Sequence, residues 1–434
     1  MREMKDSGIE WIGEIPVDWI IVRNKNAFAC SKELVGEKSE LTQLLSLTTR
    51  GIKEKDINNA EGKLPESFDT YQFVKENDIV MCLFDLDCSA VFSGISPFDG
   101  MISPAYRVLS CKECMEPRYA DYWFRYISDG RKFNHYAKNI RYTLSYEEFS
   151  ALPLLLPEKS EQRRIAAYLD RKCNQIDAII ARQEEVIEKL KAYKLSVITE
   201  AVTKGLNPNV PMKDSGDGFI GVMPEHWNVA KLGMLFDFLG GYAYNSDSYT
   251  SESDNQVIRI GNVKSGYMAL ENNPVYISDE IASATDKFRI NPGSILFTMT
   301  GTKGKRDYFF THLVTEEDCK GKKLFLNQRV GCFIPKESID VGYYNYLLKE
   351  NRILDAIFVY ETGTANQGNL GIESIRRTKV QLPSKHEQVK IREYLDNRCA
   401  KIEGLLTRKS EIIYRLMAYK KSLIYEVVTG KKEV

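Results

Sequence analysis

The chain has 434 residues, which is too long for one hydrophobic core. Its formal net charge of zero at pH 7 excludes a generic polycation. Hydrophobic residues make up 43% and charged residues 28%, the balance of an ordinary globular protein with two to three domains. The polar N-terminus, the lack of any long apolar run and nine dispersed cysteines predict a cytoplasmic protein without a membrane span and with reduced thiols.

A long apolar-periodic segment occurs twice. Residues 161–203 recur as residues 387–429, each position 226 residues later and without a gap. The first part of the repeat conserves Glu161, Gln162, Ile165, Tyr168, Leu169, Asp170, Cys173 and Ile176 as Glu387, Gln388, Ile391, Tyr394, Leu395, Asp396, Cys399 and Ile402. Such a set of identities indicates an internal duplication.

Each copy carries two rows of mostly apolar residues that repeat every seven positions and are offset by four. This spacing is the a/d seam of a coiled coil. The expected seam and partner-contact residues are Leu169, Ile176, Ile180, Ile187, Leu190 and Lys194 in the first copy and Leu395, Ile402, Leu406, Ile413, Leu416 and Lys420 in the second. A lysine in such a seam can fix register or partner choice, or it can extend its ammonium group past the seam into solvent.

The helix ends are also marked. Ser160 and Ser384 are the expected N-caps, and Gly205 and Gly430 the expected stops. At about 1.5 Å per residue each helix would be roughly 65 Å long, which suits a spacer. Because one copy lies in each half of the same polypeptide, we expect the two helices to pair within the chain, antiparallel to each other.

A second, shorter repeat opens each half. Residues 4–8, Met-Lys-Asp-Ser-Gly, recur as residues 212–216, and Trp19 recurs as Trp227. The repeating unit is therefore an opening motif, a globular domain and a long helix. We expect an α+β fold with a pseudo-twofold duplication, in which two similar globular domains (1–156 and 206–382) are joined by two long helices (157–205 and 383–434) that form an antiparallel coiled coil.

The globular segments share an order of predicted elements. Buried strands are expected at 78–84 and 294–299, and further strands at 101–110 and 326–334. Helices are expected at 119–127 and 343–348. The loops between matching strands differ, as two different ligands would require.

Basic residues, aromatic residues and amides gather in these loops and just before each long helix. Arginine and lysine can neutralise phosphates or contact guanine, and asparagine and glutamine can pair with adenine. The candidate DNA-binding residues are Arg50, Lys138, Arg141, Tyr142, Arg259, Asn262, Lys303, Lys305, Arg306, Asn366 and Gln367. The structural alternative for any one of them is a solvated surface position.

Catalytic and metal-binding patterns are weak. Cys111 and Cys114 have a zinc-like spacing that Cys82 and Cys88 would have to complete, and structural thiols are the favoured interpretation. Asp56, Glu61 and Lys63 faintly resemble a nuclease carboxylate–lysine site. No phosphate-binding P-loop, glycine-rich cofactor turn or methyltransferase signature is found, so we expect no metal, cofactor or catalytic residue in this chain.

The duplicated opening motif (Ser7–Trp19 and Ser215–Trp227) and the duplicated helix start Glu-Gln-x-x-Ile-x-x-Tyr-Leu-Asp (Glu161–Asp170 and Glu387–Asp396) carry a resemblance. Over nearly its whole length the chain resembles the specificity (S) subunit of type I restriction–modification enzymes. The resemblance implies that each globular segment is a target recognition domain for one half of a bipartite double-stranded DNA site, with the helices as the ruler between them.

The resemblance further implies a non-catalytic subunit in defence against foreign DNA. Two modification subunits would methylate adenine with S-adenosylmethionine, and restriction (translocase) subunits would use ATP and Mg²⁺. Two alternatives stay open at this point: a stand-alone DNA nuclease and a structural coiled-coil scaffold.

Overall fold

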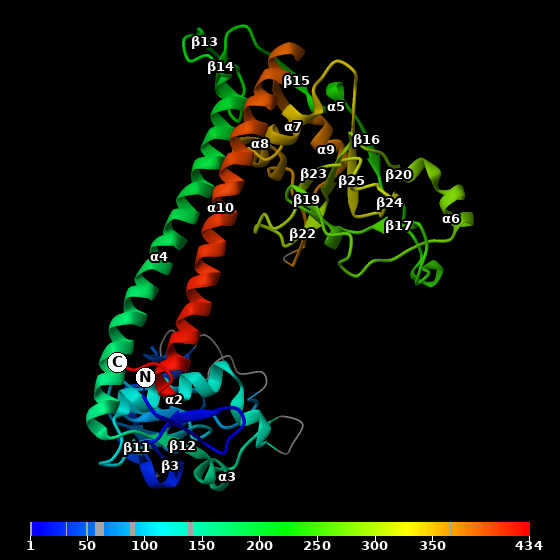
Figure 1. The fold of residues 1–434 in the computed structure, drawn as a ribbon. Helices are drawn as coiled ribbons and strands as arrows, with labels where there is room; N and C mark the ends of the chain where they lie inside the picture. Colours follow the sequence, from blue (N-terminus) through cyan, green and yellow to red (C-terminus); the bar gives the residue numbers. More distant parts are fainter. Residues whose placement is uncertain are drawn as a thin grey trace. The chain divides into compact units, whose positions relative to one another are not determined.

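A computed structural model describes residues 2–31, 33–48, 51–56, 65–86, 92–137, 142–364 and 366–434 (Figure 1). The chain forms two compact units, residues 1–185 with 409–434 and residues 186–408. Each unit contains a β-rich globular domain, half of the first long helix and half of the second. The fold is α+β, as the sequence predicts.

The long helices are α4 (Lys159–Lys204) and α10 (Lys385–Val428). Ser384 caps α10, because its hydroxyl accepts a hydrogen bond of 3.3 Å from the amide of Glu387. The expected cap at Ser160 is wrong: α4 begins one residue earlier, and the amides of its first turn bond to the carbonyl of Glu158. Gly205 and Gly430 follow the helix ends with φ of +77° and +73°, the left-handed conformation of a helix stop.

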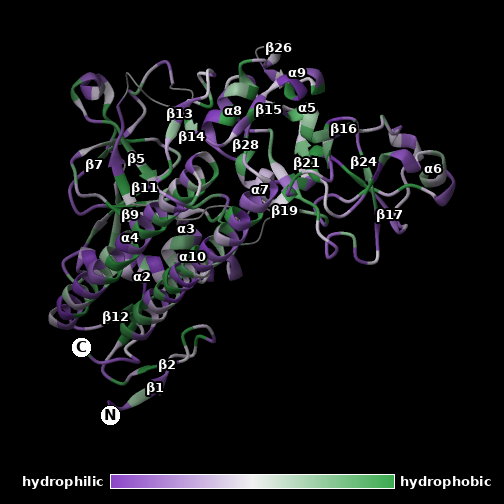
Figure 2. Ribbon diagram, turned by 90° about the horizontal axis from the view of Figure 1, so that it is seen from above, coloured by the Kyte–Doolittle hydropathy of each residue, from purple (hydrophilic) through white to green (hydrophobic). Residues whose placement is uncertain are grey.

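The two helices run antiparallel in both units. In the first unit Lys420, near the end of α10, contacts Asp177, in the first half of α4. In the second unit Lys194, near the end of α4, contacts Glu403, in the first half of α10. Figure 2 shows hydrophilic and hydrophobic residues interspersed along both helices, as a one-sided apolar seam requires.

The seam is buried only where a globular domain packs over it. Leu169, Ile176 and Ile180 join the core of the first unit, and Leu395 joins the core of the second; Ile402 is also buried. The remaining expected apolar seam residues, Ile187, Leu190, Leu406, Ile413 and Leu416, are half-buried. Of these five, Ile413 and Leu416 still pack against the core of the first unit.

The globular domain of the first unit is built on a four-stranded antiparallel sheet in the order β4-β11-β8-β9. The strands are β4 (Phe28–Ser31), β11 (Arg107–Cys111), β8 (Ile79–Met81) and β9 (Ser93–Ile95). Two smaller two-stranded antiparallel sheets pair β5 (Leu45–Thr48) with β6 (Gly51–Glu54) and β7 (Gln72–Val74) with β10 (Gly100–Ile102). Short helices are α1 (Asn24–Ala27) and α3 (Tyr146–Ala151).

Helix α2 (Pro117–Asp129) couples this domain to α4. The hydroxyl of Tyr122 donates to Asp170 at 2.8 Å, and the fully buried Tyr119 donates to the carbonyl of Leu155 at 3.1 Å. Burial raises the pKa of both phenols, so they remain neutral donors over the physiological range. The predicted helix at 119–127 is confirmed, and it positions the domain on the long helix.

The second unit repeats the plan with additions. Its central sheet has the order β16-β25-β21-β23. The strands are β16 (Phe236–Gly240), β25 (Val330–Pro335), β21 (Ile295–Thr298) and β23 (Thr311–Leu313). A further sheet joins β17 (Asn255–Ile258), β24 (Lys323–Leu326) and β20 (Arg289–Ile290), and β18 (Val263–Lys264) pairs with β19 (Tyr267–Met268). The helices are α5 (Leu232–Leu235), α6 (Asp279–Ala284), α7 (Val341–Leu347), α8 (Asn351–Phe358) and α9 (Ile372–Arg377).

Two of the predicted strands are wrong as single elements. Segment 101–110 is divided between β10 and β11 by a turn, in which the amide of Tyr106 bonds to the carbonyl of Ser103. Segment 326–334 is divided between β24 and β25, and Asn327, Gln328 and Arg329 form the connection. In both cases apolar residues continue on either side of the turn, so a run of apolar residues does not reveal it.

The repeated opening motifs form matching structures. Each begins with a two-stranded sheet, β1 (Met4–Asp6) with β2 (Glu14–Pro16) and β13 (Met212–Asp214) with β14 (Val222–Pro224). Each ends on a buried tryptophan that donates to the first turn of a long helix. Trp19 Nε1 lies 3.0 Å from Glu161 Oε2, and Trp227 Nε1 lies 2.9 Å from Glu387 Oε2.

Each globular domain is closed by a pair of strands from its two ends. β3 (Ile20–Arg23) pairs antiparallel with β12 (Pro153–Leu156), which leads into α4. β15 (Asn228–Lys231) pairs in the same way with β28 (Lys379–Leu382), which leads into α10. The chain therefore leaves each domain beside the point at which it enters.

Candidate nucleic-acid interface

In the second unit, the structure brings two of the predicted loops together at one end of the central sheet. β22 (Thr300–Gly301) pairs with β27 (Gln367–Asn369), and β27 pairs with β26 (Thr362–Thr364). The amide of the buried Leu370 donates to the carbonyl of Met299 at 2.9 Å. The loop after β21 and the segment before α9 thus form one surface, although they are about 60 residues apart in sequence.

A network of hydrogen bonds holds the first of these loops. Glu361 accepts from the Tyr308 hydroxyl at 2.7 Å and from the Gly304 amide at 3.1 Å. Burial, and then the Glu361 carboxylate, raise the pKa of Tyr308, which keeps the phenol a donor. Lys303 donates to the carbonyl of Gly363 at 2.9 Å, and Arg306 pairs with Asp355. Lys303 and Arg306 therefore shape the loop, while Lys305 is exposed.

The β26–β27 hairpin requires a glycine at its base. Gly363 has φ of +113°, and a Cβ added there would lie 2.1 Å from the carbonyl oxygen of Gln367. No L-residue with a side chain fits this conformation without moving the strand. Asn366 and Gln367, which follow in the same hairpin, are exposed.

Beside the hairpin lies an open groove of about 720 Å³. It is bordered by β22, the β24–β25 turn, the hairpin and the start of α9. Its polar lining residues are Thr300, Gln328, Arg329, Thr364, Gln367, Asn369 and Glu373. Gln328, Arg329 and Gln367 are exposed. Within the described residues, no side-chain hydrogen bond or ion pair engages these three. Their donors and acceptors are available for the edges of bases.

Sequence analysis predicted Gln367 but missed Gln328, Arg329 and Asn369. The signal for the first two was present, because an Asn-Gln-Arg sequence is unusual inside a strand. Interpreting residues 326–334 as one strand concealed it. Asn369 follows directly on the predicted segment.

Arg259 and Asn262 lie away from this groove and have structural roles. The side chain of Asn262 is buried; its oxygen accepts from the amide of Arg259 at 2.9 Å and its nitrogen donates to the carbonyl of Ala269 at 3.0 Å. Arg259 donates to the carbonyl of Asn273. Because these bonds stabilise the β17–β18 connection, we do not retain either residue in the candidate interface.

In the first unit, Arg50, Lys138 and Arg141 lie outside the described residues. Tyr142 is 37% exposed, and its carbonyl accepts from the Leu86 amide at 3.4 Å. Next to it the amide of the buried Leu144 donates to the carbonyl of Leu83 at 2.8 Å, as Leu370 does to Met299. The same two chain segments therefore meet at the same place in both domains.

The structure also bears on the weak metal-binding and nuclease patterns and on a membrane span. The described residues contain no group of three or more histidine, cysteine or acidic side chains that could hold a metal ion. Glu61, Lys63 and Cys88 lie outside them. Burial raises the pKa of Cys111 to about 12, so without a metal this thiol stays protonated at neutral pH. Among the described helices none is long and apolar enough to cross a membrane.

The fold and the groove define a protein in which two similar globular domains with different polar loops are attached to a pair of antiparallel helices. Two solved structures share this fold. A chain from a study of complex assembly and conformational transition of the type I R-M system has a TM-score of 0.70 and 14% identity, covering 96% of this chain and 99% of that one. The HsdS subunit from Thermoanaerobacter tengcongensis has a TM-score of 0.51 and 14% identity, covering 98% and 100%.

Sequence comparison gives the family. Residues 224–413 match the type I restriction modification DNA specificity domain. The MjaVIII specificity subunit of Methanocaldococcus jannaschii is 24% identical over 97% of this chain and 94% of its own length. The EcoBI specificity subunit of Escherichia coli is 23% identical over 55% of this chain and 49% of its own length. Residues 224–413 therefore carry the type I restriction modification DNA specificity domain, and over nearly its whole length the chain is similar to a specificity (S) subunit of a type I restriction–modification system.

Proposed function

We propose that each globular domain reads one half of a bipartite double-stranded DNA site and that α4 and α10 set the distance between the halves. The observation that carries this proposal is the repeated meeting of two loops at the same end of both domains, through Leu144–Leu83 and Leu370–Met299. A shared scaffold with different loops suits two different half-sites. A symmetric scaffold with identical loops would instead suit a palindrome.

The chain itself carries out no chemistry in this proposal. Two modification subunits bind S-adenosylmethionine and methylate adenine, and restriction subunits bind ATP and Mg²⁺. The similar chain from a study of type I R-M complex assembly supports the assignment of such partners. The expected site of action is the cytoplasm, where the host DNA and these partners are found.

Mapping of methylated adenines tests the proposal directly. The chain is co-expressed with a modification subunit of a type I system, and modified adenines are mapped on genomic DNA. We expect two short specific sequences separated by a fixed non-specific spacer, and no methylation by the purified chain alone. A single contiguous site, or methylation or Mg²⁺-dependent cleavage by the isolated chain, would contradict the proposal.

A domain exchange tests whether each globular domain carries the specificity for one half-site. Because β3 pairs with β12 and β15 pairs with β28, residues 24–152 and 232–378 can be exchanged between the two halves at paired strands. The exchanged protein should recognise the same half-sites in swapped order. The control reinserts each segment at its own position with the same junctions. An unchanged order of half-sites would show that the domains do not carry the specificity.

A further inference from the structure

The carboxylate of Glu361 lies where three segments of the second domain meet. Glu361 follows α8, and its amide donates to the carbonyl of Phe358 at 3.0 Å. The next residue begins strand β26 of the hairpin. The side chain accepts from the Gly304 amide and the Tyr308 hydroxyl, which belong to the loop of residues 302–310 between β22 and β23. Glu361 therefore joins the end of α8, the hairpin and this loop.

The hairpin leaves room for the carboxylate at a glycine. Gly368 on β27 is buried, and a Cβ added there would clash with a carboxylate oxygen of Glu361 and with the hydroxyl of Tyr308. The same Cβ would lie 3.1 Å from the Cα of Lys303, so the backbone of the loop also rests on Gly368. Because the φ of Gly368 is not in the left-handed region, space rather than backbone conformation requires the glycine.

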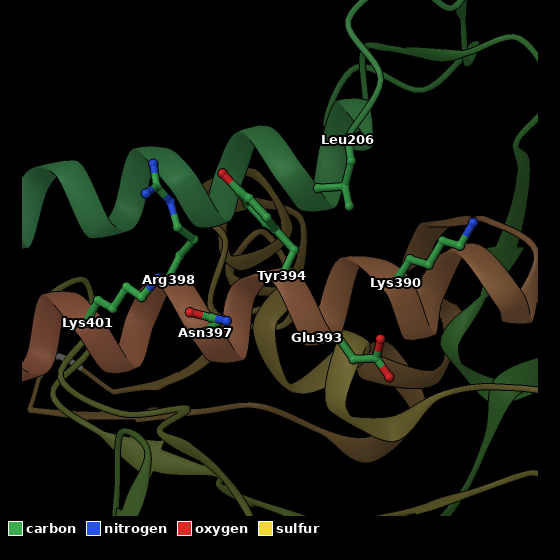
Figure 3. A pocket seen from close by; sticks show the side chains of 7 residues that line it. All are labelled: Leu206, Lys390, Glu393, Tyr394, Asn397, Arg398 and Lys401. Atoms are coloured by element: carbon green, nitrogen blue, oxygen red, sulfur yellow. The ribbon is translucent and has the colours of Figure 1, made fainter.

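The negative charge of Glu361 has no cationic partner. Within the described residues no lysine, arginine or histidine forms an ion pair with it, and its two oxygens accept from an amide and a phenol, which are neutral donors. Glu393 in the same unit is different, because it pairs with Arg392 at 3.5 Å and shares a hollow of about 510 Å³ with three cations (Figure 3). Beside a surface that is to meet DNA phosphates, an unpaired carboxylate lowers affinity, so its presence needs another reason.

The reason lies in the two segments that Glu361 holds together. The loop presents the exposed Lys305, and the hairpin presents the exposed Gln367, which also lines the groove. Hydrogen bonds to base edges require that such side chains be held within about 0.5 Å of their positions. Attraction between a lysine and phosphates is less demanding, because it extends over a Debye length of about 8 Å. A fixed spacing between loop and hairpin therefore matters more for base discrimination than for affinity.

We propose that Glu361 is a specificity-determining residue of the second domain, which acts by positioning the 302–310 loop against the hairpin and does not itself touch DNA. This inference deepens the proposed function and rests on it, since it takes one half of a double-stranded DNA site as the ligand of this domain. The carboxylate lowers affinity for every sequence, because it repels phosphates. It raises the preference for the correct half-site, because it holds the loop in place. These two effects have opposite signs and can be measured separately.

Two substitutions at Glu361 separate its charge from its hydrogen bonds. Glu361→Gln removes the charge but keeps an oxygen that can accept from Gly304 and Tyr308, whereas Glu361→Ala removes both. Anisotropy titrations of the co-expressed complex use the mapped site, single-base variants of the half-site that the second domain reads, and unrelated DNA. Both variants should bind unrelated DNA about twofold more tightly. Glu361→Gln should keep the preference for the correct half-site, and Glu361→Ala should reduce it about tenfold.

Two further variants change the partners of the carboxylate. Tyr308→Phe removes one hydroxyl and keeps the ring, whose centroid lies 5.0 Å from that of Phe358. Gly368→Ala displaces the carboxylate by the steric clash. Both should reduce the preference at the same half-site without raising the affinity for unrelated DNA. The matched control is Glu280→Ala, which removes an exposed carboxylate on α6, away from α8 and β22 (Figure 1), and should change neither quantity.

The outcomes distinguish this inference from the proposed function. If Glu361→Ala keeps the preference for the correct half-site, or if Glu361→Gln loses it to the same extent, positioning by Glu361 is refuted. If Glu361→Ala weakens binding to all DNA equally, the residue serves only the stability of the domain, and the inference is overturned. An unchanged preference at the other half-site shows that each variant is folded. A wild-type complex without any preference at the second half-site would overturn the proposed function as well.

Discussion

Lys420 Nζ lies 2.7 Å from both carboxylate oxygens of Asp177, and this contact ties the last part of α10 to the first half of α4. The pair recurs 226 positions away: Lys194 corresponds to Lys420, Glu403 corresponds to Asp177, and these two residues also form an ion pair. Both units therefore use the same antiparallel register. In the structure both seam lysines form ion pairs between the two helices, which is the arrangement that a role in register requires.

Reversal of one charge should reveal this role. Asp177→Lys places a second cation beside Lys420, and we expect the first unit to lose about 1 kcal/mol, a small value because Asp177 is half exposed. Adding Lys420→Asp should recover most of the loss. Thermal unfolding of the single and double variants gives the coupling energy. Equal, additive losses would show that the pair has no role in register, and the untouched Lys194–Glu403 pair is the internal control.

The length of the helices should determine the spacer. Insertion of seven residues after Glu185 and seven after Arg408 preserves the heptad pattern and leaves both ion pairs inside their own units. Each insertion adds about 10 Å of helix, or about three base pairs, so the non-specific spacer should lengthen by that amount with both half-sites unchanged. Adenine mapping measures the spacer. An insertion of five residues breaks the heptad and should abolish binding; equal activity of the two insertions would contradict a helical ruler.

Arg329 and Lys305 should have separable effects on DNA binding. Arg329 lines the groove, so Arg329→Ala should cost about 1–3 kcal/mol and relax the preference at one base pair of one half-site. Lys305→Ala should weaken binding to all sequences equally and lower the slope of log K against log salt by about one. Anisotropy titrations with single-base variants of the site measure both. A uniform loss for Arg329→Ala would place Arg329 on the backbone instead.

Lys349, just after α7, should reduce stability in a pH-dependent manner. Burial, and then the nearby Lys194 charge, lower the pKa of Lys349 to about 8. The unfolded chain keeps a pKa of about 10.4 and binds its proton more tightly, so burial costs free energy below pH 8 and the cost fades as the pH rises toward 10. Lys349→Met should therefore stabilise the protein by up to about 3 kcal/mol at pH 7 and have a much smaller effect near pH 10. Urea unfolding at both pH values tests this; the exposed Lys287→Met is the control, and an equal gain at both would refute it.

The sequence predicts those elements whose segments are duplicated and those whose apolar residues recur with a clear period. The duplication gives the long helices, the antiparallel pairing and the two domains, and helix α2 follows from its apolar spacing. Turns inside apolar runs, such as Ser103–Tyr106, have no comparable local signal. The sheets of the second domain also depend on pairing between distant strands, including the parallel pair β17–β24.

In the candidate interface, the type of a residue predicts whether its side chain is available to DNA less well than its position in the fold does. Gln367 and Asn262 are both amides in polar loops, yet Gln367 is exposed on a hairpin and Asn262 is buried with its polar atoms satisfied by the backbone. Lys303 and Arg306 lie in the predicted loop, but the carbonyl of Gly363 engages Lys303 and the carboxylate of Asp355 on α8 engages Arg306. Only the folded loops show which side chains have donors left over.

The strand pairs β3–β12 and β15–β28 make each domain an exchangeable cassette. Since the chain enters and leaves a cassette at neighbouring residues, a replacement of different length can join at the same paired strands, provided that it keeps the contacts of the domain with the long helices, such as Tyr122 with Asp170. Genetic recombination within the repeated motifs that flank the cassettes would substitute one domain in a single event. Under the proposed function, every partner of the chain would then receive the new target together.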